Sequence, residues 1–192
     1  ALLKSGYREM EQEHEASWGR SARIQVDGGH GEDLWARMYN VTGLHFRDLK
    51  KSRAATLGGG KDAGRFDSHA ACAEARLLIR SNHTYVAPLV DVIDAPEAGY
   101  ILIVWKYFSG GSLADSFQKL RASGSGFGDD DIWSTMRQAS AGLEHIHRDL
   151  KTSHNAIAFE TILFDNYGVL RLSGMVPDSI GAGLNRAALF ER

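Results

Sequence analysis

The chain has 192 residues, of which 43% are hydrophobic and 24% are charged, and its formal net charge is −2. This length allows one medium-sized domain or two small lobes with a hydrophobic core. The near-neutral charge indicates neither a nucleic-acid surface nor a polybasic membrane patch, so we expect a small molecule or another protein as the partner. The longest apolar run, residues 100–105, is too short to span a bilayer, and the single cysteine excludes an intramolecular disulfide. The chain begins at Ala1 without a signal peptide, and we expect a processed product or a fragment.

The N-terminal part of the chain predicts an extension followed by strands. Residues 1–21 are dense in charge, and we expect a solvated, helical extension there. Three short apolar runs follow, around Ile24, Met38 and Phe46, and they predict strands. Residues 52–66 are rich in Gly and Ala and predict a mobile loop.

The next segment predicts one helix and a hairpin. Ser68 can cap a helix that extends to about Arg80. The apolar runs at residues 86–92 and 100–105 flank a turn that contains Pro96, which is typical of two paired strands.

Two further helices are predicted in the second half of the chain. Ser112 with Asp115 three residues later resembles a capping box, which predicts a short helix to about Leu120. A longer helix begins near Asp129, because apolar residues recur there at spacings of three and four. The apolar face of this helix comprises Ile132, Met136, Ala139, Leu143 and Ile146.

A second hairpin closes the predicted order of elements. Residues 162–164 and 169–172 are apolar and flank a polar turn at residues 165–168. The whole order is strands, a helix, two strands, two helices and a hairpin, which predicts an α+β fold. This order resembles that of the protein kinase domain. The resemblance implies a bilobal fold with a mainly antiparallel β N-lobe and a mainly helical, incomplete C-lobe.

Three stretches carry the resemblance in the order in which the family has them. Residues 74–78 (EARLL) are similar to the family's αC helix, residues 103–108 (IVWKYF) to its fifth strand and hinge, and residues 141–147 (AGLEHIH) to the end of its αE helix. The implied organisation is an N-terminal extension, an N-lobe, a hinge and part of a C-lobe, at residues 1–21, 22–105, 106–111 and 112–192, respectively. The chain stops before the family's A-P-E segment, so we expect that further residues follow in the whole protein.

The pentapeptide HRDLK, residues 147–151, has the letters that open the catalytic loop of protein kinases. In the family a connector separates the last histidine of αE from this loop, and His147 matches that αE histidine. The resemblance therefore places the catalytic loop seven residues later, at residues 154–165.

In this register each residue that would serve phosphoryl transfer is replaced. Ala156 stands at the catalytic Asp, Thr161 at the metal-binding Asn, and Gly174 at the Asp of the D-F-G motif. Eighteen residues separate Ala156 from Gly174, which is the family's usual spacing. The alternative register makes Asp149 the base, but it deletes the connector and moves the hairpin turn to residues 160–161.

The nucleotide site that the resemblance implies is also altered. The Gly-rich turn keeps Gly28 and Gly31, although such a turn is common without any phosphate. A strand at residues 44–50 resembles the family's third strand, with Leu49 at its Lys position and Lys50 one step away on the opposite face. The other candidates for nucleotide contact are Glu74, which is either the αC glutamate or a solvent-facing residue, and the hinge residues Lys106 and Phe108.

These replacements predict a pseudokinase that acts as a protein-binding scaffold or allosteric regulator. We expect weak or absent binding of ATP and Mg²⁺, no other cofactor and no metal site. The replaced loop is similar in style to that of the rhoptry pseudokinases of apicomplexan parasites. That resemblance implies a secreted effector in the parasitophorous vacuole or host cell, with an active kinase or a host factor as partner. Two alternatives stay open: an atypical active kinase that uses Asp149 or Asp165 with rearranged metal ligands, and an unrelated α+β domain.

Overall fold

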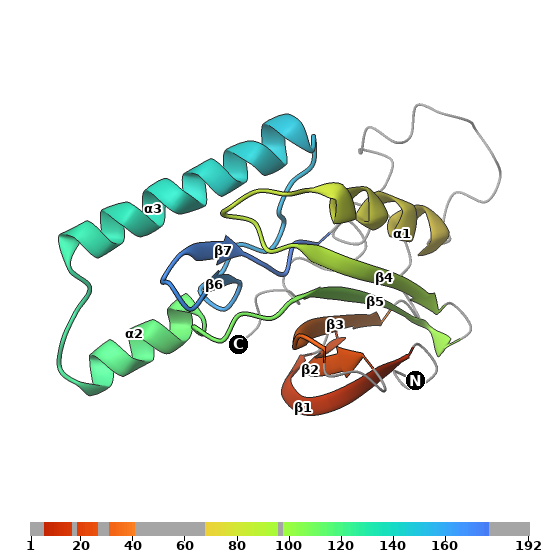
Figure 1. Cartoon of the computed structure of the whole chain (residues 1–192), viewed down its shortest axis with the longest axis horizontal. Coiled ribbons are helices and arrows are strands. Elements are labelled where there is room, and N and C mark those ends of the chain that lie inside the picture. The colour runs from red at the N-terminus through yellow and green to blue at the C-terminus, as the bar shows by residue number, and fades with distance from the viewer. Residues whose placement is uncertain (1–5, 17–18, 27–30, 41–67, 96–97, 177–192) are drawn as a thin grey trace.

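A computed structural model of the chain describes residues 6–16, 19–26, 31–40, 68–95 and 98–176. Within them an antiparallel sheet has the strand order β1-β2-β3-β5-β4, and a separate hairpin pairs β6 with β7 (Figure 1). The strands of the larger sheet are β1 Tyr7–Ala16, β2 Gly19–Val26, β3 Leu34–Asn40, β4 Leu89–Ala95 and β5 Tyr100–Lys106. This arrangement confirms the prediction of an α+β fold.

The first strand, β1, corrects the prediction of a helical extension at residues 1–21. It pairs with β2 from Tyr7↔Val26 to Ala16↔Gly19, so the sheet begins well before residue 22. The sequence explains the error, because every second residue from Glu9 to Glu15 is a glutamate. A charge repeat of two residues fits a strand, whose successive side chains point to opposite faces, and does not fit a helix. A high content of charged residues does not by itself indicate a helix.

The strand β3 lies next to β5, at the centre of the sheet. Its register runs from Leu34↔Lys106 to Asn40↔Tyr100. Two of the three predicted N-lobe strands are therefore confirmed, as the second half of β2 and as β3. The third apolar run, near Phe46, and the predicted loop at residues 52–66 lie outside the described residues.

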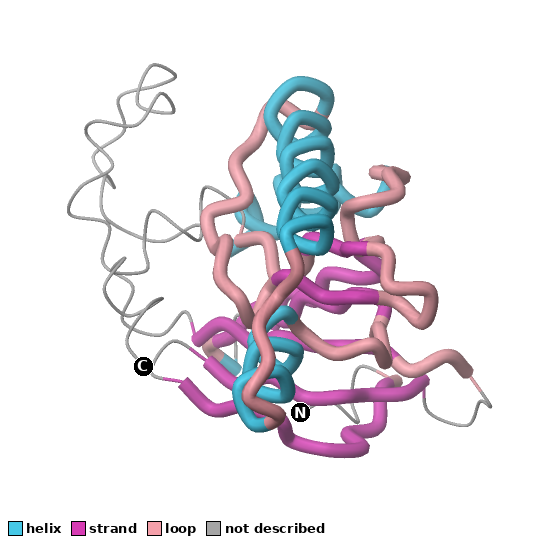
Figure 2. Tube along the Cα trace, turned by 90° about the vertical axis from the view of Figure 1, so that its left-hand side faces the viewer, coloured by secondary structure: helices cyan, strands magenta, loops and turns pink. Residues whose placement is uncertain are grey.

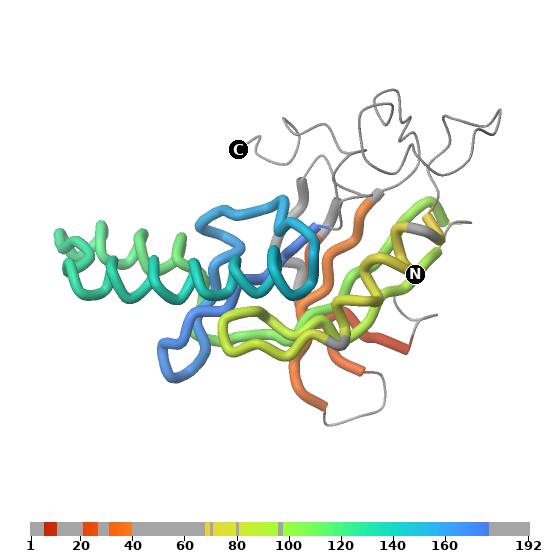
Figure 3. Tube along the Cα trace, turned by 90° about the horizontal axis from the view of Figure 1, so that it is seen from above, coloured from red at the N-terminus to blue at the C-terminus, as the bar shows by residue number. Residues whose placement is uncertain are grey.

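The helix α1, Ser68–Leu77, and a following 3₁₀ turn, Leu78–Arg80, confirm the predicted helix. Figure 3 shows α1 lying along β4 and β5. The residues that α1 buries are small, namely Ala71, Cys72 and Ala75, which lets the helix approach the sheet closely. The core between them also includes Tyr39, Val92, Ile101, Ile103 and Trp105.

The strand β5 is buried on both faces, which accounts for its unbroken apolar sequence. Alternate residues enter two different cores, because Ile101 and Ile103 face α1 whereas Leu102 and Val104 belong to a second cluster with Ile24. The predicted hairpin of β4 and β5 is confirmed by their antiparallel register.

The C-terminal part contains α2, Leu113–Ala122, and α3, Asp129–Glu144, joined by a loop that Figure 1 shows far from the sheet. The predicted capping box is present, with the Ser112 side chain bonded to the backbone N–H of Asp115 and the Asp115 carboxylate bonded to the backbone N–H of Ser112. The hairpin β6, Ile162–Phe164, and β7, Leu170–Leu172, turns at residues 165–168, as predicted.

The hairpin fixes the C-terminal part to the N-lobe. The backbone N–H of Ala87 donates to the carbonyl of Leu172 at 2.8 Å, and that of Leu172 donates to the carbonyl of Tyr85 at 2.9 Å. The helix α3 crosses the same place at Gly142, where an added Cβ atom would lie 2.9 Å from the Tyr85 carbonyl oxygen. Glycine is therefore required for this approach.

The predicted apolar face of α3 is packed only in its second half. Ile146 is fully buried, whereas Ile132 is 44% and Met136 is 56% exposed, and the neighbouring Trp133 is 70% exposed. Figure 3 shows why, because the first half of α3 extends beyond the strands, and Figure 2 shows the same helix standing above the strands. Among the described segments, none of the helices combines the length and the apolarity that a bilayer crossing requires.

Candidate functional site

Three residues singled out in the sequence, Ala156, Thr161 and Gly174, lie together beneath the sheet. The Thr161 hydroxyl donates to the carbonyl of Ala156 at 2.7 Å, and Ser173 N–H donates to the carbonyl of Thr161 at 2.8 Å. A Cβ atom added to Gly174 would lie 3.1 Å from Cγ2 of Thr161. All of this is buried, with Ala156 7% and Thr161 6% exposed. The loop of residues 154–165 and the segment after β7 therefore meet at one place.

A second set of contacts holds the start of this loop. The backbone N–H of Val176 donates to the carbonyl of His154 at 3.1 Å, and the Asn155 side chain donates to the carbonyl of Val176 at 2.9 Å. Asn155 has φ +61° and Gly174 has φ +68°, and both values are more accessible to Asn and Gly than to most residues. These residue types thus suit the close turn on each side of the site.

A cation that the sequence analysis did not single out, Arg37, also reaches this place. One terminal nitrogen of its guanidinium, Nη1, lies 3.0 Å from the Cβ position of Gly174. Arg37 is the partner of Ile103 in the β3–β5 register, and Trp35 and Tyr39 lie on the same face of β3 two residues away on either side. In the kinase motif V-A-I-K the lysine is supplied by the third strand. Arg37 likewise lies on the third strand of this sheet.

This placement corrects the assignment of the third strand to residues 44–50. The strand beside β5 is β3, residues 34–40. Leu49, Lys50 and Gly28 lie outside the described residues. The available signal was Arg37 itself, a charged residue on the inward face of a strand between two aromatic residues. The prediction of a helix at residues 1–21 moves the strand count by one, so the strand that contains Arg37 is counted as the second and not as the third.

The imidazole of His154 is enclosed in the same region. The residue is only 2% exposed, and neither ring nitrogen has a hydrogen-bond partner among the described residues. Burial, together with the positive charge of Arg37, lowers the pKa of His154 to about 4. The ring is therefore neutral at pH 7.

The other predicted nucleotide contacts lie on several elements. Glu74 is partly buried on α1, and Gly31 is exposed with open space around it. Lys106 is half-buried and forms an ion pair with Glu32 at 2.9 Å. Phe108 is buried at 8% exposure, beneath the guanidinium of Arg171.

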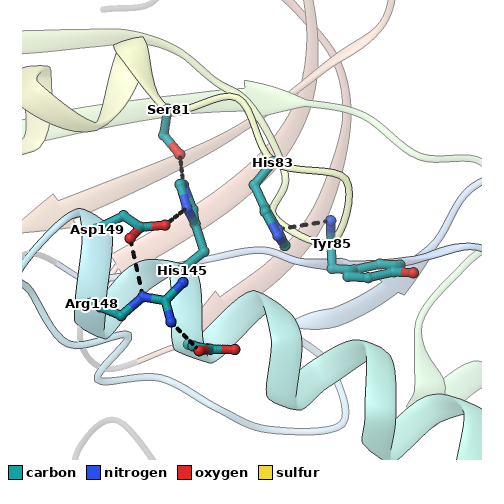
Figure 4. Close-up of polar contacts among 7 residues, drawn as sticks. Ser81, His83, Tyr85, His145, Arg148 and Asp149 are labelled. Atoms are coloured by element: carbon teal, nitrogen blue, oxygen red, sulfur yellow. Dashed lines mark hydrogen bonds and ion pairs between the residues drawn. The ribbon is translucent and has the colours of Figure 1, made fainter.

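Asp149, the aspartate of HRDLK, lies in a polar cluster at the end of α3 (Figure 4). Its carboxylate accepts a hydrogen bond from Nδ1 of His145 at 2.8 Å, and this bond lowers the pKa of Asp149, with Arg148 contributing. The other nitrogen of His145 is 2.9 Å from the Ser81 hydroxyl, and its ring stacks on His83 with centroids 4.6 Å apart. Asp149 thus serves the contact between the end of α3 and the segment after α1.

The family's metal ion, Mg²⁺, does not fit the residues that are gathered around Gly174. Magnesium requires oxygen ligands, mainly carboxylates. Ala156 and Gly174 offer no side-chain oxygen, and the Thr161 hydroxyl is engaged with the backbone. Within the described ranges, no three His, Cys, Asp or Glu side chains are placed to hold a metal.

Residues 60–178, more than half of the chain, match the family model described as "Protein tyrosine and serine/threonine kinase". A probable serine/threonine-protein kinase of Dictyostelium discoideum is 29% identical over 100 residues, which is 52% of this chain and 13% of that protein. A calcium/calmodulin-dependent protein kinase kinase of Caenorhabditis elegans is 26% identical over 100 residues, which is 52% of this chain and 17% of that protein. The aligned part is thus less than a fifth of the length of either relative.

Proposed function

Because this chain belongs to the protein tyrosine and serine/threonine kinase family, we propose that it is a pseudokinase, a binding scaffold or allosteric regulator that does not transfer phosphate. One observation carries the proposal: the side chains at Ala156, Thr161 and Gly174, which meet at one place, include no carboxylate, and the guanidinium of Arg37 lies beside Gly174. Family membership excludes an unrelated α+β domain.

The chemistry of phosphoryl transfer explains why this observation matters. A kinase needs one carboxylate to accept the proton of the substrate hydroxyl and a second, with an amide oxygen, to hold the metal ions on the phosphates. The methyl group of Ala156 cannot accept a proton, and Gly174 has no side chain to ligate a metal. The groups that would lower the barrier are therefore missing together, and a single compensating residue could not replace all of them.

The alternative is an atypical active kinase with Asp149 as its base. The contacts of Asp149 argue against it, because its carboxylate is bonded to His145 and Arg148 at the end of α3. A general base must lie within hydrogen-bond reach of the substrate hydroxyl. The site around Gly174 is built by other segments of the chain, the loop before β6 and the end of β7.

A binding role is supported by the exposed apolar residues of α3. Ile132, Trp133 and Met136 lie on consecutive turns and expose large side chains. Exposed apolar groups of this size favour contact with another surface. The identity of the partner, and the resemblance to secreted rhoptry pseudokinases, stay predictions.

A phosphotransfer assay on the whole protein tests the proposal. With labelled ATP and either Mg²⁺ or Mn²⁺, we expect no transfer to the protein itself or to general kinase substrates above that of a heat-unfolded sample. The variant Asp149→Asn tests the alternative, and Asp131→Asn, an exposed aspartate in the first turn of α3, is its matched control. Transfer by the wild type that only Asp149→Asn abolishes would establish the active kinase instead.

A further inference from the structure

A separate group of reactive side chains joins the end of α3 to the segment after α1. The Ser81 hydroxyl is 2.9 Å from Nε2 of His145, and Nδ1 of the same ring is 2.8 Å from the Asp149 carboxylate, as Figure 4 shows. A serine, a histidine and an aspartate that are hydrogen-bonded in this order are the parts of the triad of serine hydrolases. Such a triad recurs on unrelated folds and is recognised by its geometry, not by its positions in the sequence.

The contact with Asp149 fixes which nitrogen of the neutral His145 ring carries the proton. The bond from His145 lowers the pKa of Asp149, with Arg148 contributing, so this carboxylate is ionised at pH 7. An ionised carboxylate can only accept, so Nδ1 donates to it and Nε2 presents its lone pair to the Ser81 hydroxyl. The negative charge of Asp149 also stabilises the imidazolium that forms when Nε2 takes the serine proton.

The backbone and a neighbouring ring hold His145 in this orientation. His145 and Asp149 are the first and last residues of one π-helical turn, a rare conformation that is frequent at functional sites. The ring of His83 is stacked on that of His145, with centroids 4.6 Å apart and planes inclined by 10°. Burial lowers the pKa of His83, so this neighbour is neutral at pH 7 and does not repel a positive charge on His145.

The serine of this group lies where a reagent can reach it. Ser81 ends the 3₁₀ turn and is half-buried, whereas Asn82 and Thr84, which follow it, are exposed. Asn82 forms no hydrogen bond with another described residue, so its backbone N–H and its amide can donate to a ligand. Donors beside the nucleophile stabilise the negative oxygen that an attacked carbonyl develops. The open surroundings favour a small substrate with an accessible carbonyl group.

We propose that Ser81, His145 and Asp149 form a nucleophilic triad that transfers the acyl group of a small carboxylic ester to Ser81 and then to water. The Ser81 oxygen bonds to the carbonyl carbon, and the bond from that carbon to the alcohol oxygen breaks. The Ser81 proton passes to Nε2 of His145 and then to the leaving alcohol. Water, deprotonated by His145, then displaces Ser81 and releases the acid. The inference goes beyond the pseudokinase proposal and uses none of the residues around Gly174.

A fluorophosphonate probe tests the nucleophile on the unaltered whole protein. The Ser81 oxygen forms a bond to phosphorus and displaces fluoride, and mass spectrometry of the peptides identifies the labelled residue. We expect labelling of Ser81 to be about a hundredfold faster in the native protein than in urea, because only the folded chain brings His145 to Ser81. Labelling of other residues alone, or equal rates with and without urea, would overturn the inference.

The hydrolysis of p-nitrophenyl acetate tests transfer of the acyl group to water. We expect continuous release of p-nitrophenolate by the wild type, well above that of Ser81→Ala. A Ser81 that reacts with the probe but gives no more hydrolysis than Ser81→Ala would overturn the catalytic role.

Variants assign the roles of the other two residues. His145→Gln should slow both reactions about a hundredfold. Asp149 acts through His145 and is a positioning residue, so Asp149→Asn should slow them about tenfold and Asp149→Glu should restore part of the rate. Asp149→Asn should also move the midpoint of the pH–rate profile to lower pH, because the protonated ring loses its negative partner. Ser140→Ala, at an exposed serine of α3, is the matched control and should react as the wild type does.

The outcomes separate this inference from the proposed function. Far-ultraviolet circular dichroism checks that each variant is folded, and the ratio of native to urea labelling in the wild type decides the inference where a variant is not. Unchanged rates in folded His145→Gln would show that Ser81 reacts without a base, which would overturn the inference and leave the pseudokinase proposal intact. Phosphoryl transfer in the assay above would overturn the proposed function alone, since the ester and probe reactions contain neither ATP nor a metal ion.

Discussion

The buried imidazole of His154 makes the free energy of unfolding of this protein depend on pH between about 6.5 and 4. Burial is the main cause that lowers the pKa of His154 from its ordinary value of 6.5 to about 4, and the Arg37 charge acts in the same direction. The unfolded chain therefore takes up the proton first as the pH falls. The stabilisation is fully present above pH 6.5 and is lost progressively as the pH falls toward 4.

The magnitude follows from the two pKa values. A tenfold difference in proton affinity is worth about 1.4 kcal/mol, so a pKa of about 4 instead of 6.5 corresponds to about 3 kcal/mol in total. Between pH 7.5 and pH 5 about 2 kcal/mol of this is lost. That is a large part of the stability of an ordinary domain, which is about 5–15 kcal/mol.

The assay is urea unfolding followed by circular dichroism at pH 7.5, 6 and 5, on the wild type and on His154→Gln. Glutamine does not titrate. Between pH 7.5 and pH 5 the free energy of unfolding of His154→Gln should therefore fall by about 2 kcal/mol less than that of the wild type. His83, whose pKa is also lowered by burial, is present in both proteins, and its contribution cancels. The comparison uses the change with pH, so a lower stability of the variant at pH 7.5 does not affect it. Identical pH dependences would refute the conclusion that the His154 ring is enclosed and neutral.

Three further substitutions test the packing by urea unfolding at pH 7.5. Gly110→Ala should lower the free energy of unfolding by about 3 kcal/mol, because the added Cβ atom would lie 2.3 Å from the carbonyl oxygen of Phe164. Gly126→Ala is the control and should have little effect, because no atom lies within 4 Å of its Cβ position. Equal effects would contradict the close approach of the hinge to β6. Ser112→Ala should cost about 1 kcal/mol through loss of the capping box, and an unchanged midpoint would show that the cap contributes nothing. Lys106→Ala should cost less than about 1 kcal/mol, because its ion pair is at the surface, and a larger loss would mean that Lys106 has a structural role.

The parts of the fold that the sequence predicts correctly are those with local signals. The capping box before α2 depends on two residues three apart, and both of its hydrogen bonds are present. The apolar spacing of α3 and the turn between β6 and β7 are local in the same sense. A property determined by neighbours along the chain can be read without knowing the tertiary structure.

The parts that were wrong or overlooked depend on pairing between distant segments. The helical prediction for residues 1–21 failed because a charged strand is stable only when its backbone is paired, here with β2. The position of Arg37 beside Gly174 depends on the register of β3 against β5 and on the hairpin beneath them. No spacing within residues 34–40 contains that information.

The exposed half of the apolar face of α3 differs from both of these cases. The apolar spacing correctly predicts the helix, but among the described residues no element covers its first half. The spacing of Ile132 and Met136 with Ile146 predicts one continuous apolar face. Only the end near Ile146 is covered, because β7 and the segment before β4 pack there. Periodicity specifies which side of a helix is apolar, but the neighbouring elements decide how much of it is buried.

The physical role of HRDLK follows from how α3 ends. The helix continues as a π-helical turn, His145–Asp149, and Leu150 N–H donates to the carbonyl of His145 at 3.1 Å. Lys151 then has φ +56°, which turns the chain out of the helix. Asp149 is thus still part of a helical turn, bonded to the side chain one turn earlier. Residues 150–153 connect this turn to His154. The carbonyl of His154 accepts a hydrogen bond from the backbone N–H of Val176, and the loop that reaches Gly174 begins there. His147, Arg148 and Asp149 therefore belong to the helical turn that ends α3, and the loop that meets Gly174 begins after Lys151.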